Sequence, residues 1–158
     1  MHKLPYLPAG REIFYVDIDH DFMQLAFNVA RKGSLDTLHP TGAVLVKDGV
    51  PIGAGANGSS FHTRLGCVRK LLRVPTGKFY SLCSGCSPKN HAEQKAIKDA
   101  LKRKKDPKGA DLYLWGHWWC CQSCWQAMID AGIRDVYLPK GAWDKFAKGR
   151  IETPLKGF

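Results

Sequence analysis

Apolar residues recur at helical spacing in the first clearly patterned segment of the chain. They are Phe22, Leu25, Ala26 and Val29. A repeat of about 3.6 residues places such side chains on one face of a helix, and a glycine such as Gly33 often ends one. This pattern predicts a helix over residues 21–33 with a single buried stripe.

The next segment, TGAVLVKDGVPIGAGANG, contains two apolar runs that meet at Asp48 and Gly49. This pair of residues tolerates the positive φ angles of a tight hairpin turn. We therefore expect two antiparallel strands within residues 41–58.

Helical and strand patterns alternate in the second half of the chain. The spacing of apolar residues predicts a helix over residues 91–104, and ADLYLWG predicts a strand over residues 110–116. CQSCWQAMIDAG predicts a second helix closed by Gly132, and RDVYLP predicts a strand that Pro139 stops. Because helices alternate with strands after an initial hairpin, we expect an α/β fold with a mixed sheet between helices.

Three segments have no sustained period. Residues 1–19 are expected to form an arm or a short strand, and residues 58–90 form a long insertion with three of the six cysteines. Residues 141–158 are a C-terminal tail. Three apolar residues of the tail are candidate anchors: Trp143, Phe146 and Leu155. A chain of 158 residues is expected to form a single domain.

Hydropathy and cysteine content favour a cytoplasmic protein that contacts no membrane. No apolar run approaches the ~20 residues of a membrane-spanning helix, and the first residues lack the continuous apolar region of a secretory signal. In a reducing compartment, clustered thiols more often bind metal or take part in catalysis than form disulfides.

The formal net charge of +10 suits anionic partners such as nucleotides or nucleic acid, because it raises their local concentration. A solvated basic surface is the alternative, and we favour it for the run KRKK at residues 102–105. Charge alone does not identify a substrate.

Two short motifs indicate a metal site. Cys121 and Cys124 are three residues apart at the start of a predicted helix, so both sulfurs can face one point. His91 opens the other predicted helix, and with both cysteines it offers three zinc ligands and a fourth position for water. Taken singly, HAE is most often a helix surface, and CQSC could be a redox pair or a buried turn.

Glu93 follows His91 by two residues and has a defined use beside such a metal. A carboxylate there can take a proton from a zinc-activated water, whose pKa can fall to about 7, and pass it to a leaving group. The two motifs together therefore favour a catalytic zinc site.

These residues resemble the signature of the zinc-dependent cytidine and deoxycytidylate deaminase superfamily, H-x-E followed by P-C-x-x-C. The resemblance runs from about Phe22 to Pro139 and includes TGAVLVKDG, HAEQKAI, CQSC and AMIDAGIRDVYL. It implies a three-layer α/β/α fold with a mixed five-stranded sheet. It also implies Zn²⁺ on His91, Cys121 and Cys124, with Glu93 as the proton shuttle of a hydrolytic deamination that releases ammonia.

The chain departs from the signature at one position, where Cys120 replaces the proline before the first cysteine. Proline ligates nothing, so the metal site does not require it. Cys120 could itself compete as a ligand, which leaves its contribution to the metal site open.

The resemblance also implies that the substrate is a cytosine nucleotide, with dCMP favoured. It implies that Asn57 contacts the sugar and that Ala92 contacts the substrate. Asn57 could instead be a turn residue without a ligand. Three cations of the insertion could bind a phosphate or be solvated surface: Arg64, Arg69 and Lys70. His117 and Trp118 precede the cysteine pair and are candidate substrate contacts, whereas most of the nearby tryptophans are expected in the core.

The insertion contains a candidate second metal site. Cys83 and Cys86 have the C-x-x-C spacing of a zinc knuckle, and His62 and Cys67 could complete a closed structural centre. Free buried thiols are the alternative.

Two other functions stay open at this point. The protein could deaminate a base in RNA or single-stranded DNA, or it could be a non-catalytic, zinc-stabilised binding module on the same fold. Glu93 argues against the module, because a structural site has no need of a proton shuttle. A homo-oligomer is expected from the resemblance.

Overall fold

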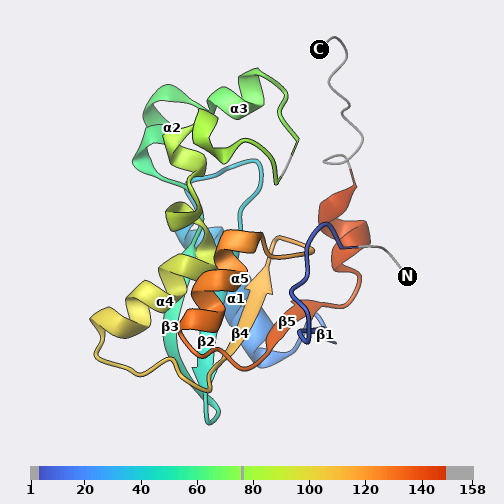
Figure 1. Cartoon of the computed structure of the whole chain (residues 1–158), viewed down its shortest axis with the longest axis vertical. Helices are drawn as coiled ribbons and strands as arrows, with labels where there is room; N and C mark the ends of the chain where they lie inside the picture. Colours follow the sequence, from blue (N-terminus) through green and yellow to red (C-terminus); the bar gives the residue numbers. More distant parts are fainter. Residues whose placement is uncertain (1–3, 76, 149–158) are drawn as a thin grey trace.

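The protein is described by a computed structural model that covers residues 4–75 and 77–148 (Figure 1). Five strands form one sheet in the order β1-β5-β4-β2-β3. The strands are β1 (Ile13–Val16), β2 (Gly42–Lys47), β3 (Val50–Ala56), β4 (Asp111–Trp115) and β5 (Val136–Pro139). β1, β5 and β4 are parallel to one another, while β2 is antiparallel to both β4 and β3, so the sheet is mixed.

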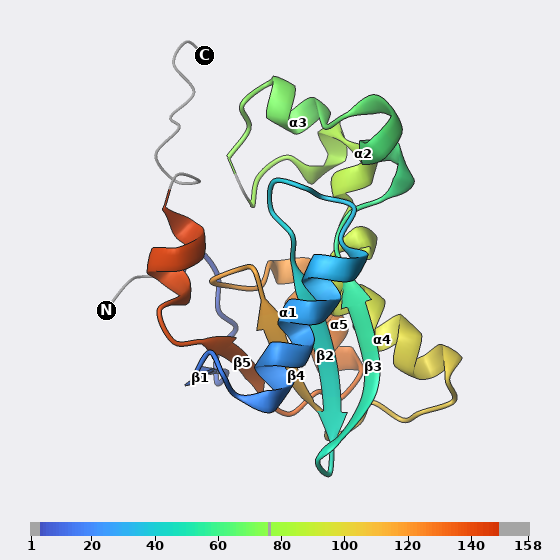
Figure 2. The same ribbon diagram turned by 180° about the vertical axis from the view of Figure 1, so that it is seen from behind.

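Helices cover both faces of the sheet. α1 (Asp21–Gly33) packs on β2, β3 and β4 and lies in front of the sheet in Figure 2. α4 (Ala92–Lys102) and α5 (Gln122–Asp130) lie together on the opposite face, which Figure 1 presents. The expected three-layer α/β/α arrangement with a mixed five-stranded sheet is therefore confirmed.

The β2–β3 hairpin turns at the predicted pair. Asp48 has a φ angle of 51° and Gly49 one of 75°, both in the left-handed region that a tight hairpin turn requires. The register of the hairpin shifts between Leu45 and Val46, beyond which the two strands stay paired.

The insertion folds into short pieces at one end of the sheet, above α4 and α5 in Figure 1. It contains α2 (Ser60–Leu65), α3 (Val68–Leu71) and three short 3₁₀ turns: η1 (Tyr80–Leu82), η2 (Ser84–Cys86) and η3 (Pro88–Asn90). Each piece is too short to show a hydrophobic period, which explains why the sequence predicts none of them.

The two ends of the described chain pack against the rest of the protein. Arg11 donates hydrogen bonds to the carbonyls of Ile133 and Arg134, next to β5. Among the expected C-terminal anchors, Trp143 packs edge-on against Trp118, and Phe146 packs against Trp115. The third, Leu155, lies outside the described residues. Within the described chain, every helix is too short or too polar to span a bilayer.

Close contact between α4 and β3 fixes the position of α4. Ala92, Ala96 and Ala100 of the helix are fully buried, and a Cβ atom at Gly55 would collide with backbone atoms of Ala92 and Ala96. Only glycine at this position lets the helix lie so close to the strand. Because α4 begins directly after His91, this contact also determines where His91 and Glu93 lie.

We predict that Gly55→Ala destabilises the protein by about 1–3 kcal/mol, since the added methyl group must push α4 from the sheet. Chemical denaturation of the two proteins measures this difference. Gly49→Asn at the hairpin turn is the matched control. Asparagine tolerates a positive φ, and a Cβ at Gly49 would meet nothing within 4 Å, so stability should change little. Equal stability of the Gly55→Ala and unmutated proteins would contradict the packing argument.

Candidate metal centre and active-site cavity

The first turns of α4 and α5 bring three potential metal ligands together. His91 is the N-cap residue of α4 and Cys121 that of α5, and Cys124 lies on the first turn of α5. The Nδ1 atom of His91 lies 3.5 Å from the Sγ atom of Cys121 and 3.5 Å from that of Cys124. We call these residues the three-residue centre.

The spacing of the three ligand atoms fits a tetrahedral zinc ion. Zinc binds nitrogen at about 2.0–2.1 Å and sulfur at about 2.3 Å, so a regular tetrahedron separates the two atoms by about 3.5 Å. The observed separations agree with this value. The donor set of one imidazole and two thiols is also one that zinc prefers. The predicted ligands are thus arranged as zinc binding requires, and their role as ligands stays a prediction.

The electrostatics of the centre favour a thiolate. A hydrogen bond from the Cys124 thiol lowers the pKa of Cys121 to about 4, against the effect of burial, and the imidazole of His91 adds to this shift. The same hydrogen bond raises the pKa of Cys124, so the pair shares one negative charge. Burial acts to lower the pKa of His91, but the hydrogen bond to Cys121 and the charge of Glu93 outweigh it, and that pKa is raised.

Glu93 lies beside the centre and is 5% exposed. Burial raises the pKa of its carboxyl group, with His91 opposing and Cys121 reinforcing this effect. His91, Glu93 and Cys121 all line a cavity of about 120 Å³. An acid that can hold or release a proton therefore faces the same space as two of the three potential ligands.

The sequence of this region matches a known family over most of its length. The model of the cytidine and deoxycytidylate deaminase zinc-binding region matches residues 16–140. The chain belongs to this family. A comparison with curated proteins found no matching sequence.

Solved structures with the same fold include deaminases of several kinds. The dCMP deaminase of the cyanophage S-TIM5 is 24% identical, with 80% of this chain and 87% of that chain covered and a TM-score of 0.51. The guanine deaminase of Bacillus subtilis is 23% identical, with coverages of 84% and 76% and a TM-score of 0.49. A structure of tRNA:A34 deaminases is 28% identical, with 75% of each chain covered and a TM-score of 0.49. The likeness to the cyanophage protein supports the cytidine deaminase-like fold.

Cys120, the departure from the deaminase signature, lies beside Glu93 but is not one of the three potential ligands. It is fully buried, and among the described residues it lies outside the three-residue centre. Burial raises the pKa of its thiol well above the usual value, and the adjacent carboxylate of Glu93 acts in the same direction. A protonated thiol of this kind is a poor metal ligand.

Of the predicted substrate contacts, Asn57, Ala92 and His117 line the cavity. The Asn57 amide already makes several hydrogen bonds. Its Oδ1 accepts from the Thr41 backbone N–H at 2.8 Å and from Ser34, and its Nδ2 donates to the His39 carbonyl at 2.9 Å. Asn57 therefore ties together the loops of the cavity wall, and one Nδ2 hydrogen is left for a ligand.

Trp118 and Trp119, which precede Cys121, are both buried in the core, and the second also reaches the cavity. The ring of Trp118 stacks on His117 at 4.5 Å and is 3% exposed, and Trp118 is not among the described residues that line the cavity. Its neighbour Trp119 does line the cavity. Adjacent positions in a turn have no fixed period, so the sequence could not distinguish them.

Arg69 is the candidate phosphate-binding cation that lines the cavity. Arg64 is exposed to solvent, and Lys70 pairs with Asp36 at 3.6 Å. Sequence reasoning missed further lining residues from segments without periodicity: Asp36, His39, Tyr80, Asn90 and Trp119. No motif pointed to them, because loop residues reach the cavity through tertiary structure alone.

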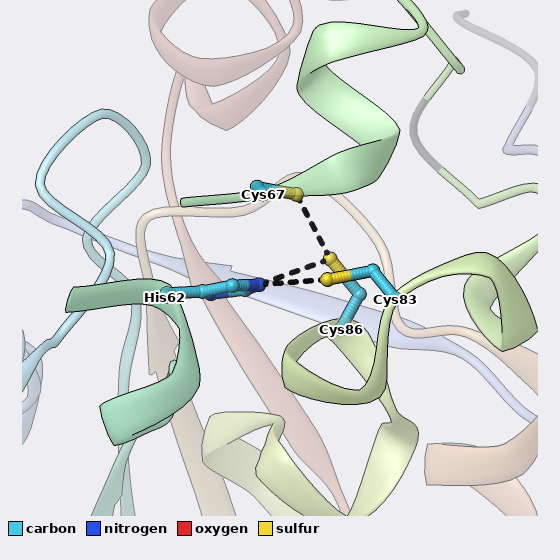
Figure 3. A group of neighbouring side chains, drawn as sticks. All are labelled: His62, Cys67, Cys83 and Cys86. Carbon is cyan, nitrogen blue, oxygen red and sulfur yellow. Dashed lines mark hydrogen bonds between the residues drawn. The ribbon is translucent and has the colours of Figure 1, made fainter. Parts of the chain in front are cut away.

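The insertion holds a second cluster of potential ligands, His62, Cys67, Cys83 and Cys86, which we call the four-residue centre (Figure 3). The Nε2 atom of His62 lies 3.3 Å from the Sγ of Cys83 and 3.5 Å from that of Cys86. The sulfurs of Cys67 and Cys86 are 3.4 Å apart, too far for a disulfide. All four ligand atoms lie within 4.8 Å of one another.

This second donor set also fits a tetrahedral zinc, with no open position. Burial acts to raise the pKa of Cys83, but hydrogen bonds from His62 and from the backbone N–H groups of Cys86, Val68 and Gly85 lower it to about 6. Burial raises the pKa of Cys86 to about 12, so one thiolate is stabilised in the absence of metal. Backbone N–H groups directed at a cysteine sulfur are what a zinc-bound thiolate needs as hydrogen-bond donors.

Proposed function

We propose that this protein is a zinc-dependent hydrolase that deaminates a cytosine nucleotide, with dCMP converted to dUMP and ammonia released. One observation carries the proposal: two thiols and an imidazole lie at the separations that zinc requires, next to the buried acid Glu93, and His91, Cys121 and Glu93 line one cavity. A purely structural centre would have a fourth protein ligand and no acid at its side.

His91, Cys121 and Cys124 would hold the zinc ion, and a bound zinc would supply an activated water as the nucleophile at neutral pH. Glu93 transfers the protons. Its carboxylate takes a proton from the attacking water, delivers it to the ring nitrogen of the base, and moves a second proton to the departing amino group. The oxygen of water replaces the amino group, and ammonia leaves.

The size of the cavity favours a base as the group that enters it. At about 120 Å³ it is smaller than the ~300–1,000 Å³ pockets that enclose drug-sized ligands. A planar, single-ring base suits such a space, with sugar and phosphate nearer its mouth. His117 and Trp119 supply ring surface for contact with the base.

Arg69 is our candidate for binding the phosphate. Its Nε and Nη2 atoms donate to the backbone carbonyls of Lys78 and Pro75, at 3.0 Å and 2.8 Å. These bonds fix the guanidinium group, which retains further N–H donors for a ligand. The Asn57-Gly58 turn and a long cysteine-bearing insertion before HAEQ also resemble the deoxycytidylate branch of the family.

A polynucleotide is the second candidate substrate, and the net charge of +10 favours it. A base in RNA or single-stranded DNA would be extruded into the same cavity. Binding of a polynucleotide weakens steeply with salt because counterions are released, whereas the binding of a mononucleotide is much less sensitive. Salt dependence therefore distinguishes the two substrates.

We further propose a second, structural zinc at the four-residue centre. Its four donors leave no position for water, and a metal there explains how a segment with little apolar packing stays folded. A cytoplasmic location follows from this proposal, because free thiols at two metal centres persist in a reducing compartment. A homo-oligomer remains our expectation from the family resemblance.

We predict that Glu93→Gln lowers ammonia release from dCMP by about 10²–10⁴-fold, the usual contribution of a general acid–base, while the metal content stays unchanged. Ammonia is measured with dCMP, cytidylate, deoxycytidine, guanine and a short single-stranded oligonucleotide as substrates. Lys98→Ala, at an exposed position of the same helix, is the matched control and should keep full activity. Turnover of the oligonucleotide alone, suppressed by salt, would favour the second candidate instead.

Arg69→Lys should lower kcat/KM for dCMP relative to deoxycytidine by about 10–100-fold, as expected for losing a charge-assisted hydrogen bond of about 1.5–3 kcal/mol. The comparison of nucleotide with nucleoside cancels any general damage to the active site. Arg64→Lys is the control, because Arg64 is exposed to solvent. An unchanged ratio would remove Arg69 from phosphate binding.

Metal analysis tests the ligand assignment. The unmutated chain should hold two zinc ions, Cys124→Ala and Cys67→Ser one each, and Cys120→Ala two. Loss of a metal from Cys120→Ala would mean that Cys120 is a ligand and that the assignment is wrong. A single zinc in the unmutated chain would exclude the structural site.

A further inference from the structure

One side chain links the two centres. The Nδ1 atom of His91 faces the sulfurs of Cys121 and Cys124, while its Nε2 atom lies 3.2 Å from the backbone carbonyl oxygen of Cys86. Cys86 also contributes its sulfur to the four-residue centre. The same residue thus offers a ligand to one centre and a hydrogen-bond acceptor to a ligand of the other.

This hydrogen bond sets the state of the imidazole. When Nδ1 is a metal ligand, the ring proton must be on Nε2, from which it donates to the Cys86 carbonyl. A partner of this kind fixes both the tautomer and the orientation of a metal-binding histidine. The Tyr80 ring, also from the insertion, packs edge-on against His91 at a centroid distance of 4.9 Å. The insertion therefore holds the imidazole at two points.

Apolar packing does little to fix the turn that carries the Cys86 carbonyl. Many large apolar side chains of the insertion are exposed: Leu65, Val68, Leu71, Leu72, Phe79 and Leu82. Local hydrogen bonds remain, from the Cys86 N–H to the Cys83 carbonyl at 2.9 Å and from Asn90 to the carbonyls of Ser84 and Gly85. The strongest constraint available to this turn is a metal bound by its two cysteine sulfurs.

His62 also lies directly on the turn. A Cβ atom at Gly85 would come within 2.5 Å of the His62 ring, so only glycine lets the imidazole approach this closely. A metal bound by His62, Cys83 and Cys86 would therefore fix the turn against the His62 imidazole. Without it, the turn and its carbonyl are held by hydrogen bonds from the backbone and from side chains such as Asn90.

We propose that metal bound at the four-residue centre orients His91 through the backbone carbonyl of Cys86 and thereby strengthens metal binding at the three-residue centre. The inference rests on the proposed function, because it takes both centres to be metal sites. Cys86 is a positioning residue in this scheme, and the insertion makes the first centre depend on the second. The coupling must be reciprocal, since it is a free energy shared by two binding events.

The test uses the full chain loaded with cadmium, whose NMR signal shifts with the number of sulfur ligands and so reports each centre separately. Cys67→Ser removes a ligand of the four-residue centre without changing a residue that lines the cavity. We expect it to weaken metal binding at the three-residue centre by about 10–100-fold, the usual effect of losing a partner that orients a ligand. Leu71→Ala, at an exposed position of the same insertion, is the control and should leave both affinities unchanged.

The reverse experiment keeps the inference testable if Cys67→Ser fails to fold. Cys124→Ala, which empties the three-residue centre, should weaken binding at the four-residue centre by the same factor. Unchanged affinity at the remaining centre in either folded variant would overturn the coupling, even if the unmutated enzyme releases ammonia from dCMP. Coupled metal binding at the two centres of an unmutated chain that releases no ammonia when loaded with zinc would contradict the proposed function and leave the coupling intact.

Discussion

The structure depends on the convergence of two helix N-termini above one face of the sheet. α4 begins after His91 and α5 after Cys121, and the two helices pack against each other. Their first turns bury an imidazole, two thiols and the carboxyl group of Glu93 together, and burying such groups singly would be unfavourable. The hydrogen bond from the protonated thiol of Cys124 to the thiolate of Cys121 reduces the free-energy cost of burying the negative charge. A divalent cation would reduce this cost further. The four polar groups lie together because each one is a hydrogen-bond or charge partner for another.

The contact between α4 and β3 positions the three-residue centre, and the insertion forms part of the cavity wall beside it. Gly55 lets the backbone of α4 lie directly against β3. This backbone contact fixes the start of α4, which carries His91 and Glu93. Loop residues such as Tyr80 and Arg69 close the cavity from the insertion side, and the Arg69 guanidinium lies 4.6 Å from the Tyr80 ring centre. In this arrangement the sheet positions His91 and Glu93, and the insertion supplies part of the cavity wall.

Much of the fold was predictable from the sequence because each long element has a clear period or a strong end signal. The helix over residues 21–33 and the turn at Asp48 and Gly49 were predicted at the positions observed, while the helix expected at residues 91–104 is shorter at both ends. The sequence indicated the three candidate ligands because His91, Cys121 and Cys124 all lie at or near the first residue of a predicted helix. The insertion was not, since its helices of six and four residues are too short for a period. Likewise, only tertiary structure determines that Trp119, but not Trp118, reaches the cavity from the core.

We propose that water replaces the exocyclic amino group of a cytosine nucleotide and that Glu93 moves the protons. The most direct test is mass spectrometry of the product after zinc-loaded protein acts on dCMP in water labelled with heavy oxygen. We expect dUMP that carries one labelled oxygen in place of the amino group, and no labelled dUMP from the Glu93→Gln protein. Unchanged dCMP, or product without the label, would contradict it.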